Sequence, residues 1–272
     1  MREILAKMNQ RRISGNRIAE DIVREHYQRL KDNPDSGDPL RDPITPATFN
    51  LQNGFYQIDK ARILSTTTPE YRQFLREAGY GDLDSCTGMK FAKGMLKYNQ
   101  DVKNTAARAG LSNTGNDGDY VVNINQPNGR KLVEALGFKL TPTALMYKLF
   151  IPYIKELVQQ GNAEAQATLK EMTDTSVGKA EWLEDLILNK TRLKIGTQER
   201  TITLPDKDGR FDRADINELG YPTQVRDQGE FYYWFPRGDE RAVFRNRGSD
   251  LSLNLNWVPS FEDEGLSVRL AK

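Results

Sequence analysis

The chain has 272 residues, with 39 basic and 38 acidic side chains and a formal net charge of +1. A balance this even excludes overall electrostatic attraction to nucleic acid or to an anionic membrane as the basis of function. One cysteine and one histidine exclude an internal disulfide and a zinc site built from four cysteine and histidine ligands.

The first residues, MREILAKMNQRR, carry charges throughout, whereas a signal peptide has a core of about 7 to 15 apolar residues. No uncharged apolar run approaches the ~20 residues that a membrane-spanning helix needs. We therefore expect a soluble protein without a signal peptide or membrane insertion, located in the cytoplasm or on a viral particle.

The N-terminal half has mainly helical patterns. Ile18, Ile22, Tyr27 and Leu30 predict a helix over residues 1–32, and the four prolines of residues 31–50 predict a linker or surface loop. A short helix is predicted over residues 69–79.

A longer helix is predicted over residues 87–110. Its buried stripe, at helical spacing, consists of Phe91, Met95, Tyr98, Val102 and Ala106. The lysines of this segment lie off the stripe, so we interpret them as a solvated face and expect no nucleic-acid partner. His26 and Cys86 lack the neighbours that catalysis requires, and we expect neither to be catalytic.

Turn residues from position 112 onward, with a predicted strand over 120–124, suggest a boundary that divides the chain into regions 1–115 and 116–272. Thr141 is a candidate N-cap for a helix that Pro152 should kink or divide, and that ends at Gly161. Helices are also predicted over residues 162–172 and 180–188.

After residue 190 the apolar period changes from helical to strand-like, with a hairpin predicted over residues 191–205. At the end of the chain, Leu251, Leu253 and Leu255 alternate with Ser252, Asn254 and Asn256. We expect the leucines to pack inward and the polar residues to face outward. The predicted fold class is α+β, a helical N-terminal region followed by a domain with a small antiparallel sheet.

The stretch DKDGRFDRAD invites a calcium-loop interpretation with Asp206, Asp208 and Asp212 as ligands. Aligning Gly209 with the obligatory glycine places Leu204 where the first ligand belongs. We therefore favour a polar turn followed by a short helix over 213–220 with Asp212 as its cap, and no metal site. The acidic turn of residues 262–264 lacks the separated carboxylates that glycosidase chemistry needs.

The tail FRNRGSDLSLNLNWVPSFEDEGLSVRLAK resembles the ending of the C-type-lectin-like fold shared by formylglycine-generating enzymes and by the variable proteins of diversity-generating retroelements. The similar segments are Arg247 to Ser249, the 251–257 strand and Gly265 to Arg269. Leu140 to Thr143 is similar to the Arg-Leu-Pro-Thr helix start of that family. The resemblance covers residues 116–272.

The resemblance implies a C-type-lectin-like domain over 116–272. Its enzymatic branch uses paired cysteines with copper, which one cysteine cannot supply, so the resemblance implies a protein that is not an enzyme and has no cofactor. Many members of the ligand-binding branch belong to phages, archaeal viruses or microbes with minimal genomes.

The implied function is recognition of a protein or glycan ligand through a diversified C-terminal surface. The contact residues expected from this resemblance are Arg245, Arg247, Asp250, Ser252, Asn254, Asn256, Trp257, Phe261, Glu262 and Asp263. Tyr232, Tyr233 and Trp234 are expected to support them. Two alternatives stay open: a calcium-binding, carboxylate-dependent enzyme acting on carbohydrate or peptide, and a structural module of a viral particle.

Overall fold

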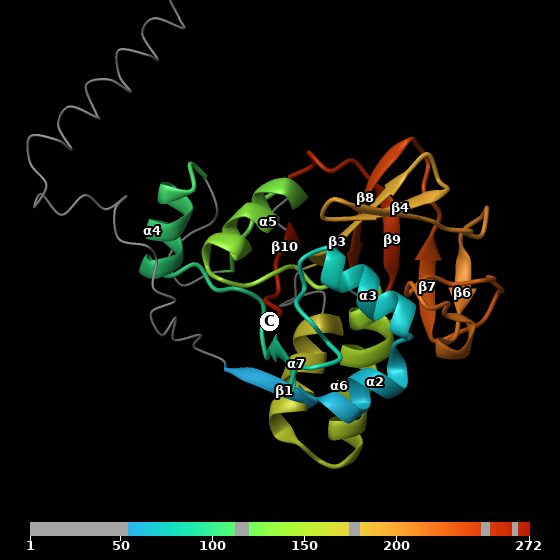
Figure 1. Ribbon diagram of the computed structural model, residues 1–272, viewed down its shortest axis with the longest axis horizontal. Helices are drawn as coiled ribbons and strands as arrows, with labels where there is room; N and C mark the ends of the chain where they lie inside the picture. The colour runs from blue at the N-terminus through green and yellow to red at the C-terminus, as the bar shows by residue number, and fades with distance from the viewer. Residues whose placement is uncertain (1–53, 112–119, 174–179, 246–250, 263–265) are drawn as a thin grey trace, which may run out of the picture. The chain divides into compact units, whose positions relative to one another are not determined.

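The computed structural model describes residues 54–111, 120–173, 180–245, 251–262 and 266–272 (Figure 1). These residues form an α+β structure with one small and one large sheet. The predicted helix over 1–32, the linker over 31–50 and His26 lie outside the described residues.

Several of the helices begin after a residue whose side chain caps the first turn. The described helices are α2 (Lys60–Thr66), α3 (Pro69–Glu77), α4 (Gln100–Arg108), α5 (Gln126–Ala135), the π-helix η1 (Leu145–Phe150), α6 (Ile151–Gln159), α7 (Ala163–Thr173) and the 3-10 turn η2 (Arg213–Asp215). Asp59, Thr68, Asn99 and Asn125 accept backbone N–H groups at the starts of α2 to α5.

The small sheet pairs β1 (Phe55–Asp59) antiparallel with β2 (Gly88–Ala92). The large sheet has the strand order β5-β4-β3-β8-β9-β7-β6, with β10 also paired to β3. Its strands are β3 (Ala180–Leu188), β4 (Arg192–Ile195), β5 (Gln198–Thr201), β6 (Gly209–Phe211), β7 (Phe231–Trp234), β8 (Glu240–Arg245), β9 (Leu253–Trp257) and β10 (Leu266–Ser267).

Pairing in the large sheet is mixed. The β7–β9 and β10–β3 pairs are parallel and the others are antiparallel. The sequence predicts only a small antiparallel sheet, because its period reports strand faces and carries no information about which strands pair. The β4–β5 hairpin, with Gly196 at its turn, is confirmed.

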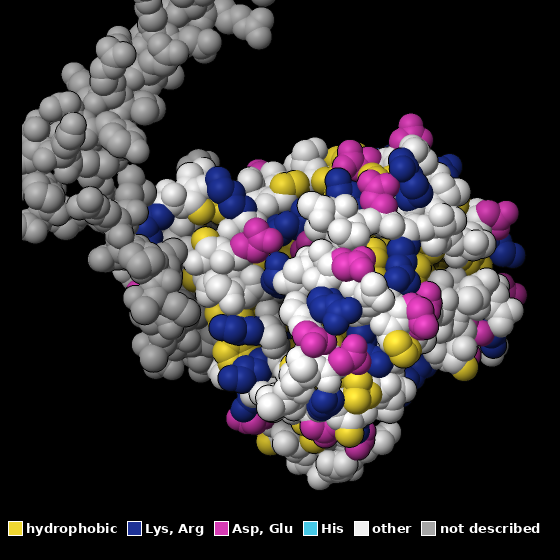
Figure 2. Space-filling view, in the orientation of Figure 1, with side chains coloured by type: hydrophobic (Ala, Val, Ile, Leu, Met, Phe, Trp, Pro, Cys, Tyr) yellow, Lys and Arg dark blue, Asp and Glu magenta, His cyan; other side chains and the backbone are white. Residues whose placement is uncertain are grey.

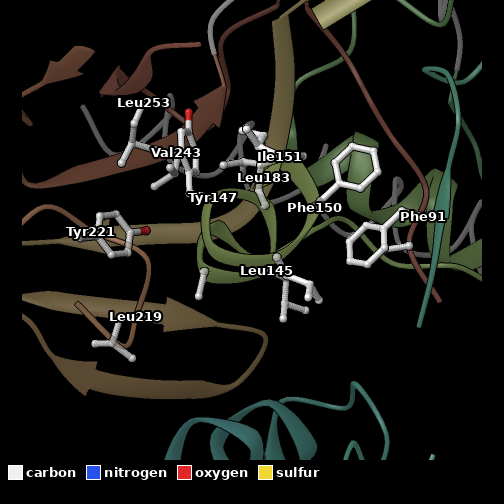
Figure 3. Close-up of a cluster of buried hydrophobic side chains, with 14 of the residues drawn as sticks. Phe91, Leu145, Tyr147, Phe150, Ile151, Leu183, Leu219, Tyr221, Val243 and Leu253 are labelled. Carbon is white, nitrogen blue, oxygen red and sulfur yellow. The ribbon is translucent and has the colours of Figure 1, made fainter. Parts of the chain in front are cut away.

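Apolar side chains pack on both faces of the large sheet. On β3, Leu183 and Ile187 join one buried cluster while Trp182 and Leu186 join the other. The first cluster includes residues of α2, α3, α6, α7 and η1, and the second includes residues of α4 and α5, the two groups that lie apart in Figure 1. Figure 3 shows the first cluster, where the Phe91 and Phe150 rings stack 5.0 Å apart.

Burial on both faces explains one wrong prediction. Residues 180–188 form β3, whereas their sequence pattern predicts a helix. All but the last residue of β3 are buried, so the apolar run lacks the one-sided alternation of a half-exposed strand. A buried strand and a buried helix are hard to distinguish by periodicity.

The predicted helix over 87–110 is also wrong in its first part. Residues 88–92 form β2 and only residues 100–108 form a helix. This helix is capped by Asn99, which the sequence did not predict as a cap. All five stripe residues are nevertheless buried. The predicted strand over 120–124 is reduced to a single bridge from Tyr120 to Lys97.

The helix after Thr141 is capped from a distance. Its early N–H at Thr143 donates to Asp185 Oδ1 at 3.0 Å, while the Thr141 hydroxyl has no hydrogen-bond partner among the described residues. A carboxylate of β3 therefore replaces the predicted local cap. The predicted interruption at Pro152 takes the form of a change from π-helix to α-helix at residue 151.

The short helices at 69–77 and 163–173 are confirmed. The helix predicted over 213–220 is reduced to η2, although Asp212 does form a capping box with Asp215.

The predicted boundary near residue 115 does not coincide with a division of the core. One cluster joins Tyr56, Ile58 and Phe91 with Leu253, and the other joins Val102 with Val268. The C-terminal segment also lies beside the small sheet, where Lys90 N donates to Lys272 O at 2.6 Å. Residues before and after position 115 thus share both clusters.

Candidate ligand-binding face

Strand β9 lies inside the large sheet, between β8 and β7. Its leucines pack inward as predicted, since Leu251, Leu253 and Leu255 are all buried. The neighbouring Tyr147 hydroxyl donates to Leu251 O at 3.0 Å, and Figure 3 shows Tyr147 beside Leu253.

The polar side of β9 is not an open surface, which corrects the expectation from alternation. Ser252 is 9% exposed and Asn254 is 6% exposed. The Asn254 side chain accepts the N–H of Asn256 at 2.9 Å. Asn254 is therefore engaged within the strand, and Asn256, Trp257 and the residues that follow form the more exposed part.

A β-bulge redirects Trp257. Phe244 pairs with Asn254 and Ala242 pairs with Trp257, so β9 has one residue more than β8 between these pairs. The extra residue places Trp257 on the same side of the sheet as Asn254, although a regular strand would place it on the side of the leucines. The Trp257 ring consequently packs edge-on against Phe244 at 5.5 Å.

The loop after β9 continues this aromatic row toward solvent. Trp257 contacts Phe261, and both rings are partly buried. Val258 is 43% exposed, and Ser260 and Glu262 are exposed as well. We define the C-terminal face as Asn256, Trp257, Val258, Ser260, Phe261 and Glu262.

Two hydrogen bonds tie the loop to the start of α5. Asn125 Nδ2 donates to Glu262 Oε1 at 2.9 Å, and Gln126 N donates to Pro259 O at 3.2 Å. Asn125 also caps α5 through Asn128 N. Sequence reasoning missed Asn125, although an asparagine followed by proline in the first helical turn is a recognisable helix start.

Tyr232 and Trp234 on β7 lie on the same side of the sheet as Asn254. Their rings are 4.9 Å apart and partly exposed, whereas Tyr233 is fully buried on the leucine side. The Trp234 Nε1–H has no hydrogen-bond partner among the described residues. The structure thus divides the three aromatics that the sequence predicted as support: Tyr233 is buried, and Tyr232 and Trp234 are partly exposed on the side of Asn254.

Arg245 is not available to a ligand in this structure. It is 0% exposed, and its guanidinium pairs with Glu181 at 3.1 Å and donates to Met172 O at 2.7 Å. Arg269 also pairs with Glu181, at 2.8 Å, and with Glu171 at 3.0 Å. The expectation that Arg245 contacts a ligand assumes that charged side chains are exposed. Arg245 is buried instead because it pairs with the buried carboxylate of Glu181.

The two arginines keep Glu181 ionised. Burial favours the neutral acid, but Arg245 and Arg269 outweigh burial and lower the pKa of Glu181 below its ordinary value. Arg269 also donates to Ala92 O at 2.9 Å. The cluster therefore joins β2, α7, β3, β8 and residue 269 near the end of the chain, and Arg245 pairs with Leu253, at the other end of β9 from Trp257.

Arg247, Asp250 and Asp263 lie outside the described residues. Of the predicted set, the structure groups Asn256, Trp257, Phe261 and Glu262 on the C-terminal face. It separates Arg245, Ser252 and Asn254 from that face by burying them.

Two of the three candidate calcium ligands, Asp208 and Asp212, are engaged by protein groups, and Asp206 is exposed. Asp208 pairs with Arg237 and accepts Phe235 N, while Asp215 pairs with Arg226 at 2.5 Å. Within the parts of the chain that the structure describes, no group of three or more histidine, cysteine, aspartate or glutamate side chains is placed to hold a metal ion.

The chain matches no known family model, no curated protein and no solved structure. Across the described ranges, no helix combines the length and the apolar composition that crossing a bilayer requires. On the side of the molecule drawn in Figure 2, basic and acidic side chains are interspersed.

Proposed function

We propose that this chain is a non-enzymatic ligand-binding protein that recognises a protein or glycan through its C-terminal face, displayed on a C-type-lectin-like scaffold. The observation that carries the proposal is the aromatic row Phe244, Trp257 and Phe261, which runs from the buried sheet to a loop with exposed Val258 and Glu262.

The chemistry of the C-terminal face suits recognition. Large rings supply contact area at a low cost in side-chain entropy, and asparagine, serine and glutamate supply adaptable hydrogen bonds. The bulge and the hydrogen bonds to α5 hold these groups in place before a ligand arrives, which lowers the entropic cost of binding.

The proposal includes diversification of the face. Side chains that vary need to be separable from those that fold the sheet, and here the exposed loop residues follow the buried strand residues in sequence. Exposed Val258, Ser260 and Glu262 vary on the loop, while Leu253 and Leu255 stay fixed in the core. Arg269, in the segment that resembles the family's closing motif, belongs to the fixed set.

Three small libraries test the display function. The first randomises Asn256, Val258, Ser260 and Glu262, the second randomises exposed Gln166, Ala167 and Lys170 on α7, and the third randomises Leu253 and Leu255. Each is displayed on phage, treated with protease to remove unfolded members and selected against lysozyme and streptavidin.

We expect the first library to survive protease as well as the second, and to yield binders that the second does not. If the first library lost as many members to protease as the third, its positions would be needed for folding, and the display function would be abandoned. Equal yields of binders from the first and second libraries would contradict a specialised face.

A separate measurement tests diversification. The coding region and its flanks are sequenced for a nearly identical copy of the segment encoding residues 240–272 that differs at adenine positions. We expect the differences to fall on codons of the C-terminal face and of the stretch 246–250. A copy whose differences fall on codons for Leu253 or Leu255 would contradict the assignment.

The calcium-dependent alternative predicts a rise in melting temperature with added Ca²⁺. Because Asp208, Asp212 and Asp215 already accept hydrogen bonds or pair with arginines, we expect no shift. A calcium-dependent rise that Asp208→Asn abolishes would favour the enzyme alternative.

A further inference from the structure

A cavity of about 380 Å³ is lined in part by the last two residues of the chain, Ala271 and Lys272. It shares no residue with the C-terminal face. Its walls come from the turn after α3, from Met89 of β2, from the turn after α5 and from the last two residues. Figure 1 shows the C-terminal end of the chain below α5 and above β1. The volume falls in the range of about 300–1,000 Å³ that is usual for small-molecule sites.

The cavity is mostly apolar with a few charged groups. Met89 and Ala271 are buried, and the rings of Tyr80 and Phe138 are partly buried. Among the described lining side chains, Lys139 and Lys272 are basic and Glu134 is acidic. An apolar lining with two ammonium groups suits an anion that carries an apolar body.

The rings and the lysines are positioned by contacts. The Tyr80 hydroxyl donates to Leu140 O at 2.7 Å, and Phe138 stacks on Phe55 at 5.4 Å. Lys139 Nζ lies 5.4 Å from the centre of the Tyr80 ring, and Lys272 Nζ lies 5.6 Å from that of Phe138. Each ammonium group thus stands beside a ring that can receive the apolar part of a ligand.

The backbone of the cavity is fixed on two sides. Lys139 and Ala271 exchange both backbone hydrogen bonds at 3.0 Å, and Lys272 N donates to Lys90 O at 2.9 Å. Lys139 forms an ion pair with Glu134, whose Oε1 lies 3.9 Å from Lys139 Nζ. That separation is too long for a direct hydrogen bond, so Lys139 keeps donors for a ligand.

We infer that this cavity binds a small amphipathic anion, a carboxylate or sulfonate attached to an aromatic or short aliphatic body. The anionic group contacts Lys139 and Lys272, and the body contacts Met89, Tyr80 and Phe138. The site is independent of the proposed function, because recognition at the C-terminal face uses none of these residues.

The probe is 3-phenylpropionate, titrated into the full chain labelled with ¹⁵N, with 3-phenylpropionamide and acetate as matched probes. The amides of Gly79, Gly81 and Gly137 line the cavity and report binding. We expect the resonances of these amides to shift with 3-phenylpropionate at millimolar concentration. The uncharged amide should bind at least about tenfold more weakly, because it loses a charge-assisted hydrogen bond. Acetate should not shift them.

Lys272→Gln should weaken 3-phenylpropionate binding by about tenfold, and Lys272→Arg should retain it. Lys170→Gln, an exposed lysine on α7, is the control and should have no effect. Lys272 is exposed, so its replacement is not expected to disturb folding.

Several results would overturn the inference. They are equal affinity for the amide and the carboxylate, no shift of the three glycines, or shifts that are the same in Lys272→Gln and Lys170→Gln. Shifts spread over the C-terminal face instead of the cavity would likewise assign binding elsewhere.

Discussion

Asn254 accepts the backbone N–H of Asn256, which lies in the bulged part of β9, and it does so while almost fully buried. Loss of such a part-buried hydrogen bond costs about 0.5–1.5 kcal/mol. We expect Asn254→Ala to lower the free energy of unfolding by this amount, measured by urea denaturation.

Asn254→Asp retains an acceptor oxygen but buries a charge, so it should not restore full stability. Ser260→Ala on the exposed loop is the matched control, with an expected change within about 0.5 kcal/mol. Equal stability of Asn254→Ala and Ser260→Ala would return Asn254 to the surface set that the sequence predicted.

Asp185 is a buried carboxyl group whose protonation should affect stability. Its carboxylate accepts Tyr221 Oη–H at 2.7 Å and Thr143 N–H at 3.0 Å, but burial dominates and raises the pKa from 3.8 to about 6. Between these values the unfolded chain releases the proton and the folded chain keeps it. Stability contributed by Asp185 is therefore present below pH 3.8 and is lost as the pH rises to about 6.

The test compares urea midpoints of the wild type and Asp185→Asn across this interval. We expect the difference between the two proteins to change with pH between 3.8 and about 6, and to be constant above it. The urea midpoint of Asp206→Asn, which changes an exposed carboxylate, should vary with pH as that of the wild type does. If the midpoint of Asp185→Asn also followed the wild type across this interval, the pKa of Asp185 would not be raised in the folded state.

At the scale of elements, the turn before Tyr221 depends on a glycine. Gly220 has φ of +90°, and a Cβ there would lie 2.3 Å from Ala144 N at the start of the π-helical segment. The close approach lets the Tyr221 hydroxyl reach Asp185, so the turn, the helix start and β3 are joined.

We expect Gly220→Ala to lower the melting temperature more than Gly161→Ala. Gly161 has a similar φ of +80°, but a Cβ added there would meet nothing within 4 Å, so alanine adds only the conformational cost of about 1–2 kcal/mol. Gly220→Ala adds a backbone clash to that cost. Equal melting temperatures would mean that the turn moves away from the helix without loss.

The elements differ in how far sequence could predict them. Helices α3 and α7 and the β4–β5 hairpin follow from caps, glycines and local periodicity. The sequence predicts a helix in place of strand β3 because both faces of the strand are covered, and only the packing of α5 on one face and η1 on the other explains its apolar run.

At the scale of the whole molecule, the shared clusters predict which fragments fold. A fragment of residues 116–272 lacks β1, α2, α3, β2 and α4, and so loses Tyr56, Phe91 and Val102 from the two clusters. We expect this fragment to lack a cooperative thermal transition, followed by circular dichroism, while residues 54–272 retain one. A cooperative transition of the shorter fragment would support the boundary that the sequence suggested near residue 115.

The sequence by itself determined the absence of paired cysteines, the even charge, the inward leucines of the last long strand and the aromatic and polar character of its end. The tertiary structure decided that Asn254 and Arg245 are buried and that Trp257 packs against Phe244. The reason is that strand alternation is a local property, whereas burial on the second face depends on α5, on Glu181 and on the register with β8, all contributed by residues far away in the sequence.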